Sequence, residues 1–311
     1  MYKQSGAEYE RRMLLYDDDN LEKVQSFTAE FSARGFQVIR YEDDLHFRVE
    51  YEEAFRSDEG KYAILVRQDA YVPYDVRKLS REYHVSYGQL YPKLNRFVLR
   101  ETTDLNLDLL SLAYENVYDD LTGRADTESF IRSTVCSKDN VRKYLDRQAA
   151  QLHSQAASAT DYKDWMRIAN MKAQIHVLAE EYRISVDVED VNDLFVSFVL
   201  DNFGKLSSKI DRTSPVLVSK AMEYMHDHSK KFVIIVMDGM SEFDWTILSR
   251  SFGDVVYEKA DAYAMIPTIT SISRQCLLSN KYPMQLVNPW GQSKEKQEFT
   301  DCARSLGYTD A

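Results

Sequence analysis

Two short segments near the carboxyl end of the chain contain side chains that could act together in chemistry. The first, residues 231–240, reads KFVIIVMDGM, and its apolar run leads into Asp238 and Gly239. The second, residues 265–274, reads MIPTITSISR and contains Thr270, 32 positions after Asp238. A carboxylate can coordinate a divalent cation, and a metal can lower the pKa of a hydroxyl enough to make it a nucleophile. The pair therefore predicts a metal-dependent site.

The first segment is typical of a strand that is buried on both faces. Residues 232–236 are all apolar, which favours a parallel strand, and Asp238 follows at its carboxyl end. Ligand crevices in open α/β sheets lie outside the carboxyl ends of the strands. Gly239 would let the backbone turn away without a side chain in the way. We therefore predict that Asp238 lies at the functional edge of a sheet.

The second segment is typical of a helix start. Pro267 and the hydroxyl residues Thr268 and Thr270 precede a helical pattern that includes Ile272 and Cys276. Free N–H groups and the positive end of the helix dipole favour an oxyanion at this position. A purely structural alternative is that these hydroxyls only cap the helix. The matching strand in the first segment favours the chemical interpretation.

Taken together, these residues resemble the PglZ domain, a branch of the alkaline phosphatase superfamily associated with bacterial BREX phage-defence systems. The resemblance rests on the aspartate-glycine strand end and on PTITSISR, residues 267–274. Related nucleotide pyrophosphatase/phosphodiesterases have a Pro-Thr-x-Thr to Tyr-Pro pattern of the same length as residues 267–283. Asn280 stands where those relatives have glycine, and asparagine tolerates the left-handed conformation of a helix end.

The resemblance implies a role for several residues. It implies a cytoplasmic hydrolase, a phosphatase or phosphodiesterase, in which Thr270 is the nucleophile. Asp238 and Thr270 would bind a divalent metal such as zinc. By its spacing one helical turn after Thr270, Arg274 could reach a substrate phosphate, and the structural alternative is an exposed helix arginine. The implied partners are a phosphorylated or phosphodiester substrate and the other subunits of an antiviral defence complex.

The chain also departs from this family. The superfamily takes further metal ligands from Asp and His residues well downstream of the nucleophile. After Thr270 this chain has no histidine, and its acids, Glu295, Glu298, Asp301 and Asp310, show no aspartate-histidine pattern. We therefore expect an amino-terminal portion of such a protein, with an incomplete metal site and no activity on its own.

Other interpretations of the same strand ends fit less well. A Walker B strand needs an upstream GxxxxGK[ST] loop, which the Gly-Lys pairs at Gly60 and Gly204 do not form. A haloacid dehalogenase needs an aspartate where Met240 stands. Near the amino terminus, MLLYDDD and Asp69 resemble the acidic site of a response-regulator receiver, but the later strands of that fold are not evident. The structural alternative is a solvated turn at residues 17–19.

A different class of function is a non-catalytic scaffold or protein-interaction subunit of a defence complex. The missing ligands favour it. So do aromatic residues of the middle region that are available either for a partner surface or for a core: Tyr162, Trp165, Phe195 and Phe198.

Composition restricts the class further. The 311 residues are 44% hydrophobic, enough for more than one core. We find no apolar run long enough to cross a membrane and no signal peptide, so we expect a cytoplasmic protein that does not bind membranes. The net charge of −11 opposes the steering of nucleic acid towards the protein and leaves direct nucleic-acid binding undecided. Three cysteines without C-x-x-C spacing indicate reduced thiols.

The order of patterns predicts an α/β protein in three parts. Residues 1–100 form a Rossmann-like domain, with strands at 13–18, 36–41 and 62–67 and a helix at 20–31. Residues 101–229 form a helical region, with helices near 105–118, 139–154, 161–183 and 189–203. Residues 230–311 are expected to begin an alkaline-phosphatase-like α/β domain that is truncated.

Overall fold

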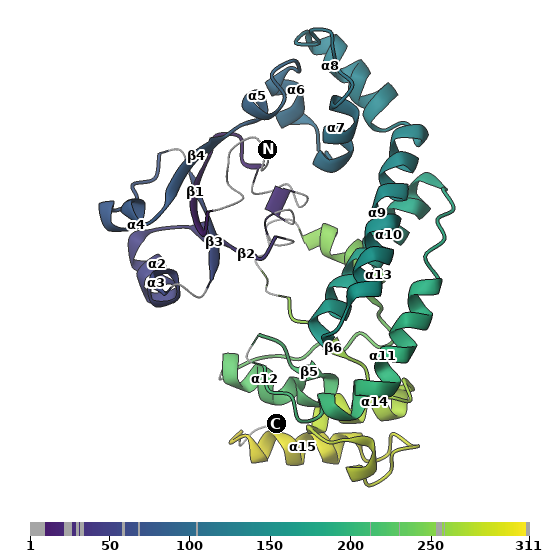
Figure 1. Cartoon of the computed structure of the whole chain (residues 1–311). Coiled ribbons are helices and arrows are strands. Elements are labelled where there is room, and N and C mark those ends of the chain that lie inside the picture. Colours follow the sequence, from purple (N-terminus) through teal and green to yellow (C-terminus); the bar gives the residue numbers. More distant parts are fainter. Residues whose placement is uncertain are drawn as a thin grey trace. The chain divides into compact units, whose positions relative to one another are not determined.

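The protein is an α/β chain in which a parallel sheet is followed by a largely helical region (Figure 1). The computed structural model describes residues 10–21, 27–28, 31, 34–57, 60–67, 69–103, 105–211, 213–229, 231–252, 257 and 259–308. The chain divides into two compact units, Met1–Tyr144 and Leu145–Ala311, and the division falls within helix α9, Lys138–Ser158. The three-part division predicted from the sequence stays a prediction.

The first unit contains a four-stranded parallel sheet of Rossmann-like character. Its strands are β1 (Arg12–Asp17), β2 (Phe36–Tyr41), β3 (Lys61–Arg67) and β4 (Arg81–Val85). Their order across the sheet is β2-β3-β1-β4, and every neighbouring pair is parallel. The sequence predictions of β1, β2 and β3 are confirmed. β4 was not predicted, because only Val85 of its five residues is buried.

A receiver domain is excluded by the strand order. Receivers have the order 2-1-3-4-5, in which β1 lies between β2 and β3. Here β3 lies between β2 and β1. The acidic residues after β1 therefore do not form the site that the receiver interpretation required.

One core cluster of the first unit lies against one face of this sheet. Ile64 of β3 and Leu14 of β1 are fully buried and pack with Phe47 and Phe55. Phe47 belongs to α2 (Asp44–Glu50) and Phe55 to α3 (Glu52–Arg56). The two aromatic rings contact each other edge to face, 5.3 Å between centroids. These two short helices therefore cover the sheet through a pair of phenylalanines.

The other described helices of the first unit follow β3 in the chain. They are α4 (Tyr74–Lys78), α5 (Tyr87–Leu90), α6 (Arg96–Glu101), α7 (Leu107–Tyr114) and α8 (Arg124–Phe130), which continues into a π-helical turn (Ile131–Val135). The helix predicted near 105–118 is confirmed as α7. The helix predicted at 20–31 lies largely outside the described residues.

The second unit is mostly helical. Its elements are α10 (Tyr162–Tyr182), α11 (Asp190–Leu206), β5 (Val216–Leu217), α12 (Ala221–His228), α13 (Glu242–Leu248), β6 (Ala262–Tyr263), α14 (Thr270–Ser279) and α15 (Glu295–Ser305), with short 3₁₀ turns at Val218–Lys220, Ser249–Phe252 and Pro283–Gln285. The helices predicted near 139–154, 161–183 and 189–203 are confirmed as α9, α10 and α11. No helix within the described ranges combines the length and the apolar character that crossing a bilayer requires.

Aromatic residues of the middle region pack on one another. Trp165 is 5% exposed, and its ring lies 5.3 Å from Phe195 and 5.9 Å from Phe198. Tyr162 is also buried. Tyr162 and Trp165 are therefore core residues, and the sequence-based alternative that offered them for a partner surface is wrong.

The segment after α11 is tied to the start of α10 by Asp211. Its carboxylate accepts hydrogen bonds from the Tyr162 hydroxyl (2.6 Å) and the Thr213 backbone N–H (2.8 Å), and it pairs with the Lys163 ammonium (2.6 Å). Burial alone would raise the pKa of Asp211, but the contacts with Lys163, Tyr162 and Thr213 outweigh burial and lower it. The ionised form of Asp211 therefore stabilises the fold of the second unit.

Candidate functional site

The strand predicted at residues 232–236 does not form. The segment has no strand partner among the described residues, and Val233 and Ile235 are 88% and 83% exposed. The strands described in the second unit are β5 and β6, each of two residues, and they pair with each other in parallel. A strand that is apolar on both faces needs neighbours for its backbone and cover for both faces. The described part of the unit supplies neither to this segment, so the prediction of a buried strand is wrong.

Asp238 lies in the turn that follows this segment. The backbone N–H of Met240 donates to the carbonyl of Met237 (3.4 Å), and Gly239 has a φ of +72°. Residues with a side chain rarely adopt that conformation, so the turn predicted at Gly239 is confirmed. The Asp238 carboxylate is 44% exposed. It is therefore accessible but does not project from the end of a strand.

Thr270 is the first residue of α14. The N-cap residue is Ile269, and no side chain caps the helix. Thr268 and Thr270 are both exposed, and neither hydroxyl has a hydrogen-bond partner in the part of the chain that the structure describes. The capping alternative for these two hydroxyls is therefore not realised. At the other end of α14, Asn280 adopts the left-handed conformation (φ 54°), as its sequence position predicted.

Arg274 brings the two predicted segments together. It lies one turn after Thr270 on α14, and its Nη1 is 3.8 Å from Oδ2 of Asp238. Its Nη2 donates a hydrogen bond of 2.5 Å to Oε1 of Glu295, the first residue of α15. Asp238, Arg274 and Glu295 thus form one cluster at the start of α14.

Sequence reasoning missed Glu295 as a site residue. It was noted only as one of the acids after Thr270. No local pattern distinguishes Glu295 from Glu298 or Asp301 on the same helix. Only the packing of α15 against α14 places its carboxylate on Arg274. The packing of the two helices, and not a sequence motif, therefore determines which acid contacts Arg274.

The opposite face of α14 is held in a small core. Ile272 and Cys276 pack with Met265 and Leu286. Cys276 is fully buried, which confirms its predicted place in a core, and burial raises the pKa of its thiol to about 11. Gln275 adds two hydrogen bonds of 3.1 Å, from its Nε2 to the carbonyls of Asn288 and Gly291. These contacts fix α14 and leave Thr270 and Arg274 on its accessible side.

The described residues do not complete a metal centre. They contain no group of three or more His, Cys, Asp or Glu side chains arranged to hold a metal ion. A catalytic zinc site usually has three protein ligands. The cluster at α14 offers Asp238 and Glu295, but the guanidinium of Arg274 lies between their carboxylates. The sequence predicted an incomplete zinc site with Asp238 and Thr270 as ligands, and that site stays a prediction.

The acids that follow β1 have a structural role. The Asp19 side chain is fully buried; its Oδ2 accepts the backbone N–H of Tyr87 (2.7 Å), and its carboxylate pairs with Arg96 (2.7 Å). Asp17 is also buried and accepts the backbone N–H of Asp19 (3.1 Å). The prediction of a solvated turn at residues 17–19 is therefore wrong for these two acids.

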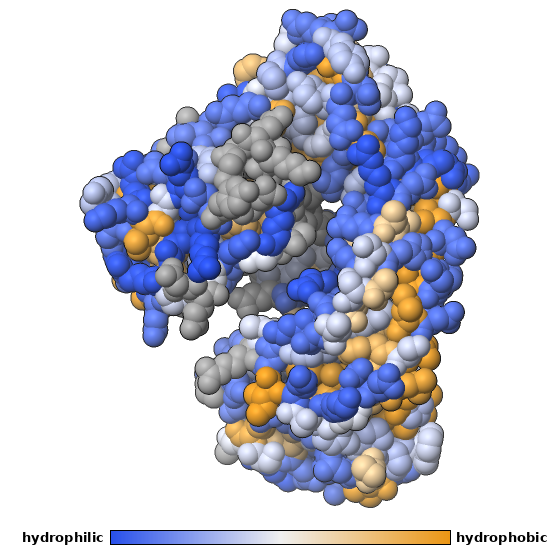
Figure 2. All heavy atoms as spheres, viewed as in Figure 1, coloured by the Kyte–Doolittle hydropathy of each residue, from blue (hydrophilic) through white to orange (hydrophobic). Residues whose placement is uncertain are grey.

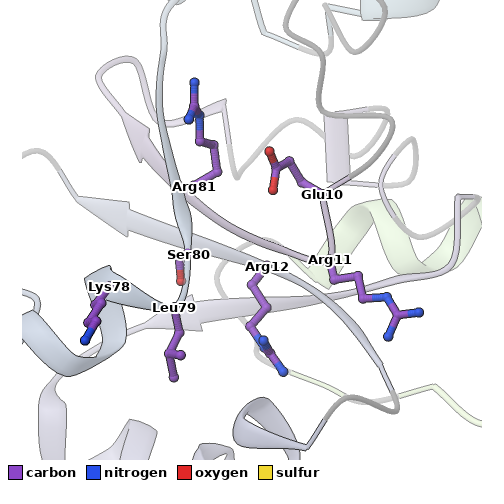
Figure 3. Close-up of a pocket in the computed structure, with 7 residues that line it drawn as sticks. All are labelled: Glu10, Arg11, Arg12, Lys78, Leu79, Ser80 and Arg81. Atoms are coloured by element: carbon purple, nitrogen blue, oxygen red, sulfur yellow. The ribbon is translucent and has the colours of Figure 1, made fainter.

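A shallow cavity of about 320 Å³ lies in the first unit, at the edge where β1 and β4 begin (Figure 3). The residues that line it are mostly cationic: Glu10, Arg11, Arg12, Lys78, Leu79, Ser80 and Arg81. Figure 3 shows the charged ends of Arg11, Arg12, Lys78 and Arg81 pointing in different directions. Arg12 donates to the carbonyls of Phe55 and Ser57. The cavity therefore lacks convergent groups for a ligand, and it lies opposite the sheet edge that usually binds one.

Comparisons with known proteins add no assignment. The chain matches no protein-family model. A search of curated proteins likewise found no match.

Proposed function

We propose that residues 230–311 belong to a PglZ-type, alkaline-phosphatase-like domain and carry part of a phosphohydrolase site. One observation carries the proposal. Arg274 lies one turn after Thr270 and has its Nη1 3.8 Å from Asp238, so it links the two residues that the sequence motifs single out. The resemblance to PglZ proteins supplies the reaction class, a phosphatase or phosphodiesterase of an antiviral defence system.

The geometry of α14 supports roles for its own residues. The Oγ1 of Thr270 would lose its proton to solvent and form the new bond to phosphorus while the bond to the leaving oxygen breaks, and the leaving oxygen would take a proton from solvent. Water would then hydrolyse the phosphothreonine and restore the hydroxyl. The exposed helix start would favour the negative phosphoryl group, and Arg274 would offset charge on its oxygens. A divalent metal such as zinc, when bound, would supply the activation of the hydroxyl. Asp238 is the carboxylate proposed as its ligand, and the remaining ligands are not among the described residues.

The test is hydrolysis of bis(p-nitrophenyl) phosphate by the protein with Zn²⁺, Mn²⁺ or Mg²⁺. Thr270→Ala should lower kcat at least about a thousandfold, since loss of a nucleophile has effects of that order or more. Thr270→Ser should keep measurable turnover because it retains the hydroxyl. The matched control is Thr268→Ala, an exposed threonine two positions earlier, which should change kcat less than about twofold. Equal losses in the Thr268 and Thr270 variants would overturn the assignment.

A second candidate function is a protein-interaction subunit of the same defence complex. The observation that favours it is the exposed apolar surface of the second unit. Val233, Ile235 and Met237 are more than half exposed in the unpaired segment, and Leu200 is 80% exposed on α11, along which Figure 2 shows hydrophobic surface. Exposed extended segments accept a strand from a partner, and exposed apolar patches mark interaction sites.

Co-expression with the other subunits of such a system distinguishes the two functions. A subunit that docks on this segment should lose co-purification when Val233 and Ile235 are both changed to lysine, and it should keep it when Thr270 is changed to alanine. Retained co-purification of the double lysine variant would contradict the interaction function.

A further inference from the structure

The donors of Arg274 are only partly used. A guanidinium carries five N–H donors in a planar fork. Among the described residues, Arg274 makes one side-chain hydrogen bond, from Nη2 to Glu295. The 3.8 Å between its Nη1 and Asp238 exceeds hydrogen-bond range, and its Nε is buried without a partner. Arg274 therefore retains donors for a further acceptor.

Glu295 is likewise only partly used. Its Oε1 accepts from Arg274, while its Oε2 is buried without a partner. The strongest arrangement of arginine and carboxylate is bidentate, with two parallel hydrogen bonds, which would engage two donors of the fork. The observed pair has one such bond, so it leaves buried polar atoms unsatisfied on both side chains. The observed pair is therefore weaker than a bidentate pair of the same two side chains would be.

Glu295 can move without moving its helix. It is the first residue of α15, after Lys294, which provides no side-chain cap. The body of the helix is anchored further along by buried Cys302 and Ala303, and by Glu298, which pairs with Lys281. A change of the Glu295 rotamer would leave these contacts in place.

We propose that Glu295 is a lock on Arg274: its carboxylate occupies the guanidinium in the absence of a ligand, and a phosphate group displaces it on binding. A phosphate presents two oxygens to a guanidinium, which matches the fork better than the single contact from Glu295. The carboxylate therefore competes with the anion for Arg274 and lowers its affinity. Asp238 adds a second negative charge beside the same guanidinium and opposes the anion as well. This inference rests on the proposed function for the location of the phosphate, at the start of α14.

The test is titration of this chain with inorganic phosphate at low ionic strength, followed by calorimetry and by the Arg Nε–H resonances in ¹⁵N NMR spectra. Glu295→Gln should tighten phosphate binding by roughly five- to tenfold, because it removes a competing charge from a partly buried, charge-assisted pair. Arg274→Gln should abolish binding, both alone and combined with Glu295→Gln. The matched control is Asp301→Asn, an exposed acid on the same helix, which should change the affinity less than twofold.

Each result decides the inference. Unchanged or weaker phosphate binding by Glu295→Gln, with the NMR spectrum of a folded protein, would overturn the lock. Absence of phosphate binding in both the wild type and Glu295→Gln would also overturn it. If Glu295→Gln does not fold, Glu295→Ala takes its place. Tighter phosphate binding by Glu295→Gln without any hydrolysis by the wild type would sustain the lock and remove the proposed function. Hydrolysis by the wild type without tighter binding by the variant would do the reverse.

Discussion

Two apolar runs of five residues, one in each unit, have nearly the same composition and different structures. Residues 62–66, YAILV, form the interior of β3 and are at most 6% exposed. Residues 232–236, FVIIV, form no strand, and two of them are more than 80% exposed. The first run lies between β1 and β2 and is covered by Phe47 and Phe55. The second has no such neighbours among the described residues.

The difference shows what an apolar run can predict by itself. Composition indicates that a segment would be stable when buried. It does not supply the strands that pair with the backbone, and a strand is formed only when those partners are present. The position of Asp238 depends on the second run, which forms no strand. The positions of the acids after β1 depend on a sheet that the structure contains.

The largest difference is expected for the matched isoleucines Ile64 and Ile235. Ile64 is fully buried, so Ile64→Ala should cost the first unit about 3 to 4 kcal/mol through lost burial and the cavity left behind. Ile235→Ala should change the stability of the second unit by less than about 0.5 kcal/mol, because its side chain already contacts water. Hydrogen exchange at increasing urea concentration, read on peptides from each unit, measures both. Similar losses would mean that both runs are buried.

The acid that follows β1 and the acid that follows residues 232–236 should also differ. Asp19→Asn removes the charge that pairs with Arg96 in a buried position and should destabilise the first unit by about 2 to 3 kcal/mol. Asp238→Asn removes an exposed charge and should cost less than about 0.5 kcal/mol. The same urea series checks both variants. A large loss of stability in Asp238→Asn would show that this acid is structural and would weaken its proposed site role.

The second unit should respond to acid through Asp211. Its folded pKa is lowered, so its stabilising contribution is complete above the unfolded value of about 3.9. That contribution is lost as the pH falls below about 4 and through the lower folded pKa. Asp211→Asn should cost about 1.5 to 2 kcal/mol at pH 7 and flatten this dependence. Unfolding of the second unit, followed by tryptophan fluorescence between pH 7 and pH 2, tests it, since every tryptophan of the chain lies in that unit. An equally steep decline in the variant would assign the acid sensitivity elsewhere.

The smallest expected effects are at two glycines in left-handed turns. Gly35 (φ +81°) leads directly into β2, and Gly239 (φ +72°) follows the unpaired run. Neither has an atom within 4 Å of an added Cβ, so the cost of alanine is conformational. Gly35→Ala should lose about 1 kcal/mol because β2 fixes the turn, while Gly239→Ala should lose less because its segment can rearrange. The difference can be measured by thermal unfolding of each unit. A larger loss at Gly239 would show that its turn is held as firmly as that of Gly35.

The sequence predicted those elements whose local pattern agrees with their surroundings. β1, β2 and β3 have buried interiors, and α10 has an aspartate capping box, so periodicity and capping identified them. β4 was missed because REYHV is polar at most positions and pairs at the sheet edge. The strand at residues 232–236 was wrongly predicted because its pattern contains no information about its partners.

The candidate site was predicted in part for the same reason. The helix start at Thr270, the left-handed Asn280 and the turn at Gly239 are local features and were confirmed. The approach of Arg274 to Asp238 follows from the fold, as does its hydrogen bond to Glu295. The contact with Glu295 joins residues 21 positions apart, and Glu295 belongs to no motif. A single sequence therefore could not predict it.

Hydrogen exchange of the amides in residues 61–67 and 231–240 tests the contrast between the two runs most directly. The amides of β3 should be protected by their hydrogen bonds to β1 and β2 and should exchange only when the sheet opens. The amides of residues 232–236 should exchange within seconds at neutral pH, at the rate of an unstructured peptide. Equal protection of the two segments would contradict the contrast, because it would show that residues 232–236 are paired in a sheet.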